Sequence, residues 1–416
     1  MMIFSIVKKI FFPFYKSKNI KIIFNILNSS GENKNAMFVG GCVRKFILDQ
    51  EIKDIDIATI LNPEEVIKKF ENTDVEVKKT GIEHGTLTLL LNKQHFEITT
   101  LRKDISTDGR HAVVSFTDNW KEDSARRDFT INSIYLDNKG KIFDPHSGIS
   151  DLKEGKIIFI GDPNQRIKED YLRVLRYIRF SVQYENYNIT EDVFKALQLN
   201  LGGVFKLSKE RVYQELNKIM SLKNFSTILN NDKILKIFRL VFPEFRYVEN
   251  LKRIGEINSL KYLYINRDII LASMLIDSSN NHSYFSYKYK VSNETKNNLT
   301  FFAQYLKEIK KNKNFFKKDL KKNIFYHGKN KIKLLFILNF IYNKKIKVED
   351  LKIFISKIEK ISIPSFPING TYLIDKGIKK GKNVGKIIKK IEKQWIENDF
   401  NLNSEKIDNL LKKNSN

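Results

Sequence analysis

Apolar and polar residues follow two different patterns along the chain. Between about residues 36 and 160, apolar runs are short and are separated by turn residues. Such runs are typical of β-strands, and we expect strands at 37–39, 55–59, 75–80, 85–91, 95–102, 111–116 and 141–145. A helix is expected at 63–70, because Pro63 suits the first turn of a helix.

From about Glu169 onward, apolar residues recur every three or four positions, which predicts helices. The pattern therefore predicts an N-terminal third of mixed α/β structure, followed by a predominantly helical remainder.

The first 27 residues are apolar but are interrupted by lysines. Their longest uncharged run is far shorter than the ~20 residues that span a bilayer. No small-residue cleavage site of a secretory signal follows, and arginine is missing. We therefore expect an amphipathic first helix and no association with a membrane.

The composition is strongly basic. Among 416 residues, 74 Lys and Arg stand against 48 Asp and Glu, which gives a formal net charge of +26. Codon bias in an AT-rich genome would produce this surplus whatever the function. A polyanionic partner is a second, compatible explanation, because such a charge attracts nucleic acid or an anionic membrane. The lone cysteine, Cys42, excludes disulfides within the chain and a cysteine-based zinc site, and it fits a reducing compartment.

The segment 307–323 is a lysine-rich run that includes a pair of phenylalanines. It is either a solvated helix face or a surface that contacts phosphates, each of which would steepen the salt dependence of binding.

Two carboxylates follow shortly after a glycine pair. Asp54 and Asp56 are separated by one apolar residue in a predicted strand, so their side chains share one face. Carboxylates this close repel each other unless a cation lies between them, and Mg²⁺ is usually held by one or two carboxylates plus substrate phosphates. Solvated acids at a strand edge are the alternative. Gly40, Gly41 and Arg44 favour the metal site, because a glycine-led helix N-terminus and a cation can bind a triphosphate.

Glu97 would be a third acid, on a strand close to the first two. It is either a metal ligand or a support of the metal site, or it forms a structural ion pair with an arginine such as Arg102.

The segment 122–137 is expected to begin a helix, with Asp123 or Ser124 as its cap. Arg126, Arg127 and Asp128 are consecutive and so face different directions. One of them can bind phosphate or ribose while another anchors the helix.

A second cluster lies at 168–180, which we expect to be one helix. There Asp170, Arg173 and Arg176 are three residues apart and cover an arc of about 120°, while Arg179 drifts off this face. A carboxylate can accept from the exocyclic amino group of a base, and a guanidinium can donate to a ring nitrogen or carbonyl. Such a pair would accept C or A and refuse U or G. The alternative is an ordinary ion pair along a helix.

The chain resembles the class II CCA-adding tRNA nucleotidyltransferases, within the superfamily of DNA polymerase beta-like nucleotidyltransferases. The resemblance covers about residues 36–220, in the family's order, and rests on the segments FVGGCVRKFIL, KDIDIAT, HGTLTLLL, HFEITTLRKDISTDGRHAVVSF, EDSARRDFTINSIYLD, FDPHSGISDLKEGKI, EDYLRVLRYIRF and LSKERVYQEL. It implies an α/β catalytic head at 1–160, an all-α neck that recognises the nucleobase at 161–225, and a helical body and tail that bind tRNA at 226–416.

The resemblance also implies roles for particular residues. Asp54 and Asp56 would bind Mg²⁺, and Glu97 matches a further acid of the family. Gly40, Gly41 and Arg44 would contact the triphosphate, and Arg127 the ribose and phosphates. The protein template for CTP or ATP would be formed by Asp170, Arg173, Arg176 and Arg179. The segment 102–114 matches a flexible loop associated with the switch from C to A addition, and Asp144 and Gly148 match a hinge between head and neck.

Two positions depart from the family's pattern. Lys45 follows Arg44 where the family usually has Asp, and Asp49 stands where it usually has Gly. The first departure leaves open how Arg44 is oriented.

We therefore expect an enzyme that adds C, C and A to the 3′ end of tRNA from CTP and ATP, with release of pyrophosphate, in the bacterial cytoplasm. A bacterial poly(A) polymerase is the nearest alternative, although the strand at 85–91 lacks the basic element expected of one. A non-catalytic RNA-binding protein on this fold is the alternative of another class.

Overall fold

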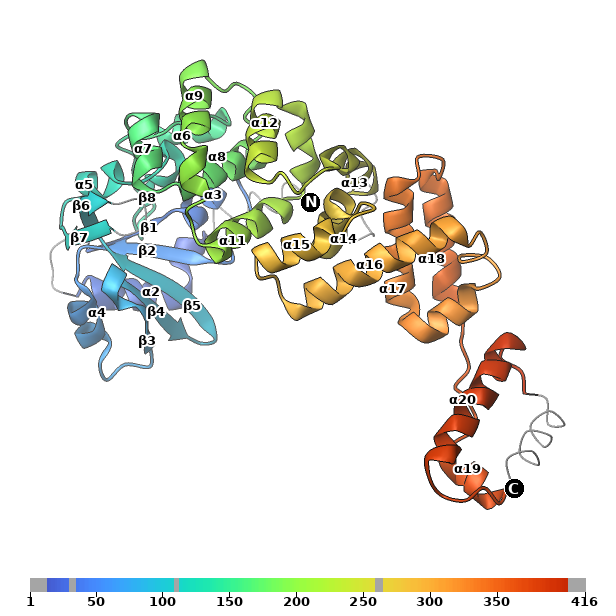
Figure 1. Cartoon of the computed structure of the whole chain (residues 1–416). Helices are drawn as coiled ribbons and strands as arrows, with labels where there is room; N and C mark the ends of the chain where they lie inside the picture. The colour runs from blue at the N-terminus through green and yellow to red at the C-terminus, as the bar shows by residue number, and fades with distance from the viewer. Residues whose placement is uncertain (1–12, 30–34, 108–111, 259–264, 403–416) are drawn as a thin grey trace. The chain divides into compact units, whose positions relative to one another are not determined.

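The computed structural model describes residues 13–29, 35–107, 112–258 and 265–402. The chain forms two compact units, Met1–Pro243 and Glu244–Asn416, which are described separately below (Figure 1). The predicted boundaries near residues 160 and 225 stay predictions.

A seven-stranded sheet forms the centre of the N-terminal part of the first unit. Its strand order is β3-β4-β5-β2-β1-β8-β9, and only β2 and β5 run parallel. The bounds are β1 Ala36–Val39, β2 Ile55–Thr59, β3 Glu76–Gly81, β4 Thr86–Leu91, β5 Gln94–Thr100, β8 Tyr135–Leu136 and β9 Ile142–Phe143. A separate pair is formed by β6 Arg102–Thr107 and β7 Ala112–Phe116. The strands expected from the sequence are confirmed; the tip of the predicted flexible loop, 108–111, lies outside the described residues.

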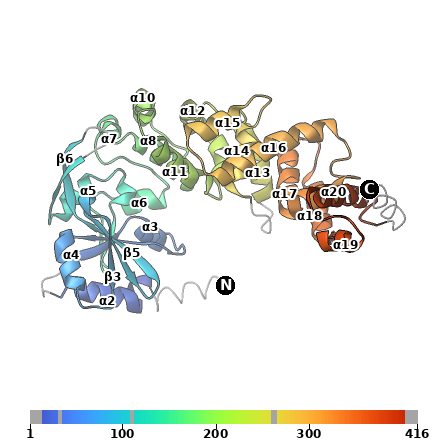
Figure 2. The same cartoon turned by 60° about the horizontal axis from the view of Figure 1, so that its bottom comes forward.

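Helices pack on the sheet because their apolar residues share one face. The helix α2 (Lys18–Leu27) buries Ile20, Ile23, Phe24 and Leu27, and the Phe24 ring lies 4.6 Å from the Phe38 ring of β1. The helix α4 (Pro63–Phe70) begins at the predicted proline, with a capping box made by Asn62 and Glu65. Figure 2 shows α2 and α4 beside the sheet.

The short helix α3 (Gly41–Ile47) joins β1 to the carboxylate strand β2. It ends in a Schellman arrangement, in which Gln50 donates to the Lys45 carbonyl and Asp49 to the Phe46 carbonyl. Asp49 has φ +60°, in the left-handed region that glycine favours and that Asp tolerates better than most residues. The glycine that the resemblance implies at this position would adopt this conformation without strain.

The rest of the first unit is helical, as expected. Its helices are α5 Trp120–Ala125, α6 Gly148–Lys153, α7 Pro163–Glu169, α8 Leu172–Gln183, α9 Glu191–Leu199, α10 Leu201–Val204, α11 Lys209–Met220 and α12 Asp232–Val241.

Two sequence-based expectations about helix boundaries are wrong. The helix α5 is capped by Asn119 and has Asp123 inside it, so neither Asp123 nor Ser124 is its cap. The segment 168–180 is not one helix, because the backbone is extended at Asp170, after α7, and α8 begins at Leu172. Asp170 instead accepts a hydrogen bond from the Leu172 N–H at 3.1 Å.

Asp144 and Gly148 shape the turn before α6. The Asp144 carboxylate accepts from the backbone N–H groups of Gly148 and Ile149, at 2.8 and 2.9 Å, and so caps the helix. A Cβ atom on Gly148 would lie 2.2 Å from the carbonyl oxygen of Thr130. Glycine is therefore required here by close backbone packing.

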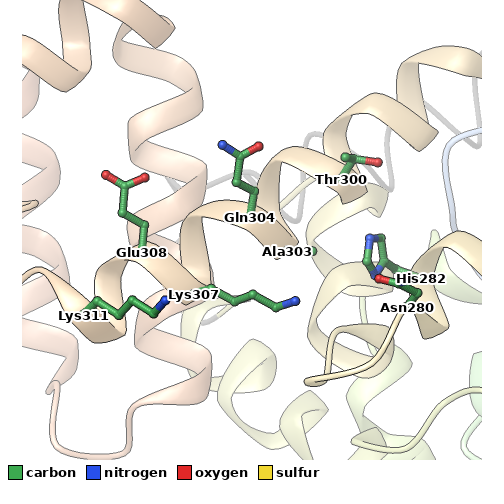
Figure 3. Close-up of a pocket in the computed structure, with 8 residues that line it drawn as sticks. All are labelled: Asn280, His282, Thr300, Ala303, Gln304, Lys307, Glu308 and Lys311. Atoms are coloured by element: carbon green, nitrogen blue, oxygen red, sulfur yellow. The ribbon is translucent and has the colours of Figure 1, made fainter.

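The second unit consists of helices α13 Leu251–Asn258, α14 Arg267–Leu275, α15 Asn281–Lys288, α16 Asn293–Lys311, α17 Leu320–Tyr342, α18 Val348–Lys360, α19 Gly370–Asp375 and α20 Lys382–Glu397. The helix α14 is buried along most of its length. A cavity of about 490 Å³ lies between α16 and the start of α15 (Figure 3). In the described parts of the chain, no helix is long and apolar enough to cross a membrane.

We predict that Gly148→Ala destabilises the first unit by about 1–3 kcal/mol or more, because the methyl group overlaps a backbone carbonyl that cannot rotate away. Gly202→Ala on α10 is the matched control, since a Cβ atom there meets nothing within 4 Å. This control should be neutral or stabilising by up to about 1 kcal/mol. Thermal unfolding of both variants checks the prediction; equal melting temperatures would contradict it.

Candidate active site

An arginine-rich cavity of about 530 Å³ opens in the first unit, between the sheet and the helices that follow it. Eight arginines and three aspartates are among its lining residues. The lining consists of Gly40, Gly41, Arg44, Asp56, Arg102, Arg126, Arg127, Asp128, Asn132, Asp170, Leu172, Arg173, Arg176, Arg179, Phe180 and Arg211. This excess of guanidinium groups suits a polyanionic ligand such as a nucleoside triphosphate.

The structure brings most of the predicted site residues to this cavity. Nine of them line it, namely Gly40, Gly41, Arg44, Asp56, Arg127, Asp170, Arg173, Arg176 and Arg179, whereas Asp54 and Glu97 do not. Asp54 is exposed and immediately precedes β2. Glu97 on β5 lies directly opposite Asp56 on β2 in the parallel register, as expected for an acid on a neighbouring strand.

Asp56, which lines the cavity, and Glu97, which lies beside it on β5, repel each other electrostatically. Burial raises the pKa of Asp56 above its usual range, although the Arg44 guanidinium and the Gly41 N–H act in the opposite direction. Burial and the nearby charge of Asp56 also raise the pKa of Glu97. A cation bound here would relieve the repulsion between the carboxylates.

The donor set of Asp54 and Asp56 fits a hard divalent cation. Carboxylate oxygens are the ligands that Mg²⁺ prefers, and it completes its shell with water and phosphate oxygens. Within the described residues, no group of three or more His, Cys, Asp and Glu side chains is placed to hold a metal by itself. The site therefore fits a metal that arrives with a phosphate ligand better than a closed structural metal site.

The glycine pair lets the backbone approach the carboxylate. A Cβ atom on Gly40 would lie 3.4 Å from Oδ2 of Asp56, and one on Gly41 would lie 3.8 Å from it. Gly40 has φ +72° and is the N-cap of α3. The N-terminus of α3 thus points its backbone donors at the edge of the cavity.

Arg44 is oriented without the acid that the resemblance implies at position 45, where this chain has Lys45. Its Nε donates to the Tyr184 hydroxyl at 2.9 Å, and its Nη1 donates to the side-chain oxygen of Asn132. Its guanidinium also lies 5.0 Å from the centre of the Phe180 ring. Residues far along the chain therefore fix Arg44, which answers the question that Lys45 raised.

Arg126 and Arg127 share one buried acid. Asp123 accepts from Arg126 at 2.6 and 2.9 Å, from Arg127 at 2.9 and 3.1 Å, and from the Tyr135 hydroxyl at 2.7 Å. Burial alone would raise the pKa of Asp123, but the two guanidiniums and the hydroxyl hold it well below its usual range. Arg127 is thus positioned by Asp123, with its guanidinium at the wall of the cavity.

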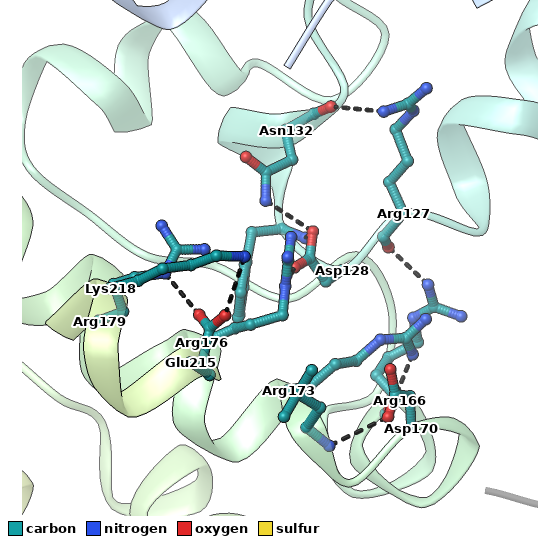
Figure 4. Close-up of polar contacts among 12 residues, drawn as sticks. Arg127, Asp128, Asn132, Arg166, Asp170, Arg173, Arg176, Arg179, Glu215 and Lys218 are labelled. Atoms are coloured by element: carbon teal, nitrogen blue, oxygen red, sulfur yellow. Dashed lines mark hydrogen bonds and ion pairs between the residues drawn. The ribbon is translucent and has the colours of Figure 1, made fainter. Parts of the chain in front are cut away.

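A chain of polar contacts connects Arg44 to Arg176 on α8. Asn132 accepts from Nη1 of Arg44. Asn132 also donates to Asp128 at 2.7 Å, and Asp128 accepts from Nε of Arg176 at 2.6 Å (Figure 4). Burial would raise the pKa of Asp128, but Arg176 and Asn132 lower it below its usual range. Arg126 and Arg127 converge on Asp123, so the expectation that these consecutive residues face different directions holds only for Asp128, which binds Arg176. That one of them binds phosphate or ribose stays a prediction.

The predicted single face of Asp170, Arg173 and Arg176 is wrong, because Asp170 lies before α8. Asp170 pairs instead with Arg211 of α11 at 3.0 Å, and Arg173 binds Glu169 and the carbonyls of Arg166 and Arg126. Arg179 pairs with the buried Glu215 and lies 4.0 Å from the Phe180 ring. All three predicted arginines still line the same cavity.

Several residues of the cavity were not singled out from the sequence. Arg211 lies within the segment LSKERVYQEL and Asn132 within EDSARRDFTINSIYLD, so both were in segments that carry the resemblance. Glu215, which holds Arg179, lies in the same segment as Arg211. Tyr184 has no local signal, because its partner Arg44 is 140 residues away.

Comparison with known proteins agrees with this architecture. Residues 36–158 match the family model described as "Poly A polymerase head domain". Residues 186–248 match the model described as "Probable RNA and SrmB- binding site of polymerase A". A CCA-adding enzyme of Lactococcus lactis subsp. cremoris is 32% identical over 375 residues, which cover 88% of this chain and 89% of that protein. The chain belongs to the family of CCA-adding enzymes.

Other relatives and solved structures extend this result. The mouse protein named "CCA tRNA nucleotidyltransferase 1, mitochondrial" is 28% identical over 92% of this chain and 87% of its own length. The solved structure of the CCA-adding enzyme of Bacillus stearothermophilus in complex with CTP has a TM-score of 0.67 and 23% identity, covering 91% of this chain and 92% of that one. The Thermotoga maritima CCA-adding enzyme complexed with tRNA has a TM-score of 0.62, covering 96% and 97%. These structures share the fold.

Membership of this family makes the chain a nucleotidyltransferase, with a catalytic head that carries the sheet and a mostly helical remainder. Enzymes of this class generally use divalent metal ions.

We predict that Tyr184→Phe raises the KM for CTP at least roughly tenfold, because a hydrogen bond to a charged group, worth about 1.5–3 kcal/mol, is lost. The control is Lys45→Ala, which changes the residue next to Arg44 without touching its partners and should shift the KM less than twofold. Steady-state kinetics on an RNA acceptor checks this. A larger effect of Lys45→Ala would contradict the assignment of Tyr184 as the residue that orients Arg44.

Proposed function

We propose that the protein adds C, C and A to the 3′ end of tRNA without a nucleic-acid template, using CTP and ATP and releasing pyrophosphate. The observation that carries this proposal is the cavity that joins the half-buried Asp56 to eight arginines, in a chain similar to CCA-adding enzymes over most of its length.

In this proposal the triphosphate lies along the arginine side of the cavity. The Arg44 guanidinium would neutralise charge on the phosphates, and Gly40 and Gly41 would bring the N-terminus of α3 close to them. Arg127 would contact the ribose and phosphates. Asp54 and Asp56, with Glu97 as a supporting acid, would hold Mg²⁺. That ion would supply charge neutralisation at the attacking 3′ oxygen and at the departing pyrophosphate.

The nucleobase is proposed to lie against α8. Asp170 would accept from the exocyclic amino group that C and A share, while Arg173 would donate to the ring. Arg176 and Arg179 would complete this template. Asp170 is held by Arg211 and Arg173 by Glu169, which supports the proposal because fixed side chains can discriminate between bases.

The division of labour follows the predicted boundaries, with catalysis at 1–160, base recognition at 161–225 and tRNA binding at 226–416. Several relatives named CCA-adding enzyme are bacterial, such as the one from Lactococcus lactis. Their bacterial origin supports the proposal that this protein acts in a bacterial cytoplasm.

Product analysis tests the function. Incubation with a tRNA lacking its CCA end, and with each nucleotide alone or in combination, should give two added C residues from CTP and a complete CCA end from CTP plus ATP. A long A tract from ATP alone would identify a poly(A) polymerase instead. Binding of the RNA without any addition would favour a non-catalytic RNA-binding protein.

We predict that Asp54→Ala and Asp56→Ala each lower the rate of CTP addition at least about 10³-fold, because the charge stabilisation of the leaving group is lost. Asp56→Asn, which keeps the shape but removes the charge, should be similarly inactive.

The matched control is Asp74→Asn, an exposed acid before β3 in the same domain, which should keep the wild-type rate. Single-turnover addition to a tRNA that ends before the CCA sequence measures all four variants. Wild-type rates in Asp54→Ala would overturn the assignment of the metal carboxylates.

A further inference from the structure

A cavity in the second unit is lined by the N-terminus of α15 and by one face of α16. The residues Thr300, Ala303, Gln304, Lys307, Glu308 and Lys311 share one face of α16, at spacings of three and four residues. Asn280 and His282, at the N-terminus of α15, line the opposite side (Figure 3).

The N-terminus of α15 has one free donor at this cavity, because the Asn281 N–H already donates to Oγ of Ser279 at 3.3 Å. Asn280 occupies the N-cap position, but its side chain makes no capping hydrogen bond. Among the described residues, the backbone N–H of His282, in the first turn, has no hydrogen-bond partner, whereas those of Ser283 and Tyr284 donate to the Asn280 carbonyl. Uncapped N–H groups at the positive end of a helix dipole are a binding site for an anion.

His282 supplies a second, independent observation. Its side chain lines the cavity and is 95% buried, since its relative exposure is 5%, yet Nδ1 has no hydrogen-bond partner within the described structure. Burial, with a contribution from Lys307, lowers the pKa of this imidazole, so the ring is neutral near pH 7. A buried polar group without a partner is costly, and a ligand in the cavity would provide the missing contact.

Two lysines and one acid, Glu308, line the cavity, so its lining is net positive. Asp277 also acts on His282, but it is paired with Arg246 at 2.6 Å. Figure 3 shows the ammonium group of Lys307 extending toward Asn280 and His282, with Lys311 one turn further along α16. The Glu308 carboxyl group points away from both ammonium groups in this view. Burial and the Glu308 charge together raise the pKa of Tyr305. Burial and Lys331 lower the pKa of His327 of α17, and the Glu308 charge opposes that shift.

We propose that this cavity binds a backbone phosphate of the RNA substrate, through the N-terminus of α15, Lys307 and Lys311. The proposal rests on the proposed function and deepens it, because it places one RNA contact outside residues 186–248, which match the RNA-binding family model. The volume of about 490 Å³ exceeds that of a phosphate group and leaves room for an adjoining ribose. The lysine-rich run that begins at Lys307 would continue the contact along the RNA backbone.

The test measures the affinity of the full-length protein for a tRNA lacking its CCA end, by fluorescence anisotropy between 50 and 200 mM KCl. Lys307→Ala and Lys311→Ala remove charges that line the cavity. Lys310→Ala is the matched control, because it removes the same charge from the same turn of α16 but does not line the cavity. Lys307, Lys310 and Lys311 are all exposed, so the variants should fold.

We expect Lys307→Ala to weaken RNA binding about five- to tenfold at the lowest salt and to reduce the slope of log K against log salt by about one, the value for one lost phosphate contact. Gln304→Glu, which places an acid in the cavity, should weaken binding at least as much. Lys310→Ala should shift the affinity less than about twofold with an unchanged slope.

Two results would overturn the proposal. Equal effects of Lys307→Ala and Lys310→Ala would mean that a diffuse positive field, and not this cavity, attracts the RNA. Tight binding of inorganic phosphate by calorimetry, together with unchanged RNA affinity in Lys307→Ala, would mean that the cavity takes free phosphate. Because the assay measures binding alone, a wild-type protein that binds RNA with this lysine dependence but adds no nucleotide would refute the proposed function and leave the site intact.

Discussion

The hydrogen bonds of Asp128 hold the two sides of the catalytic cavity together. This buried carboxylate accepts from Arg176 of α8 and from Asn132, which in turn accepts from Arg44 of α3. Removing one partner from such a buried pair leaves an uncompensated charge, which lowers the free energy of unfolding by about 3–5 kcal/mol. The helices α3 and α8, which carry Arg44 and Arg176, are thereby fixed to each other.

The same principle governs the remaining arginines of the cavity. Arg126 and Arg127 are held by Asp123, Arg173 by Glu169, Arg179 by Glu215 and Arg211 by Asp170. Each acid binds one side of a guanidinium and so fixes the orientation of that arginine. The arginines that line the cavity still outnumber the aspartates that line it. A preorganised excess of positive charge is what a triphosphate needs, because no side chain then has to reorganise when charge develops on the leaving group.

Local patterns were enough to find the elements and most of the site. Alternating apolar residues identified β2 and β5, and the register that places Glu97 opposite Asp56 agrees with the expectation of a third acid on a neighbouring strand. The boundary near Asp123 was wrong because Asn119, four residues earlier, caps α5 and leaves Asp123 inside the helix. The helix expected through Asp170 is broken because Asp170 is extended, accepts from the Leu172 N–H and pairs with Arg211 of α11. The partners of Arg44 and Arg179 could not be predicted, since Tyr184 and Glu215 are brought to them only by the packing of α8 and α11.

By itself, the sequence determined the α/β head with its helical continuation, the glycine-led helix before the carboxylate strand, and the residue types that a nucleotidyl transfer requires. These depend on spacing along the chain, because strand and helix periods decide which side chains share a face. Only the tertiary structure decided which acid orients which arginine and how Arg44 is held next to Lys45. It also decided that His282, with a free backbone N–H, lines the same cavity as Lys307. Such pairings depend on contacts between residues far apart in sequence, which no local pattern encodes.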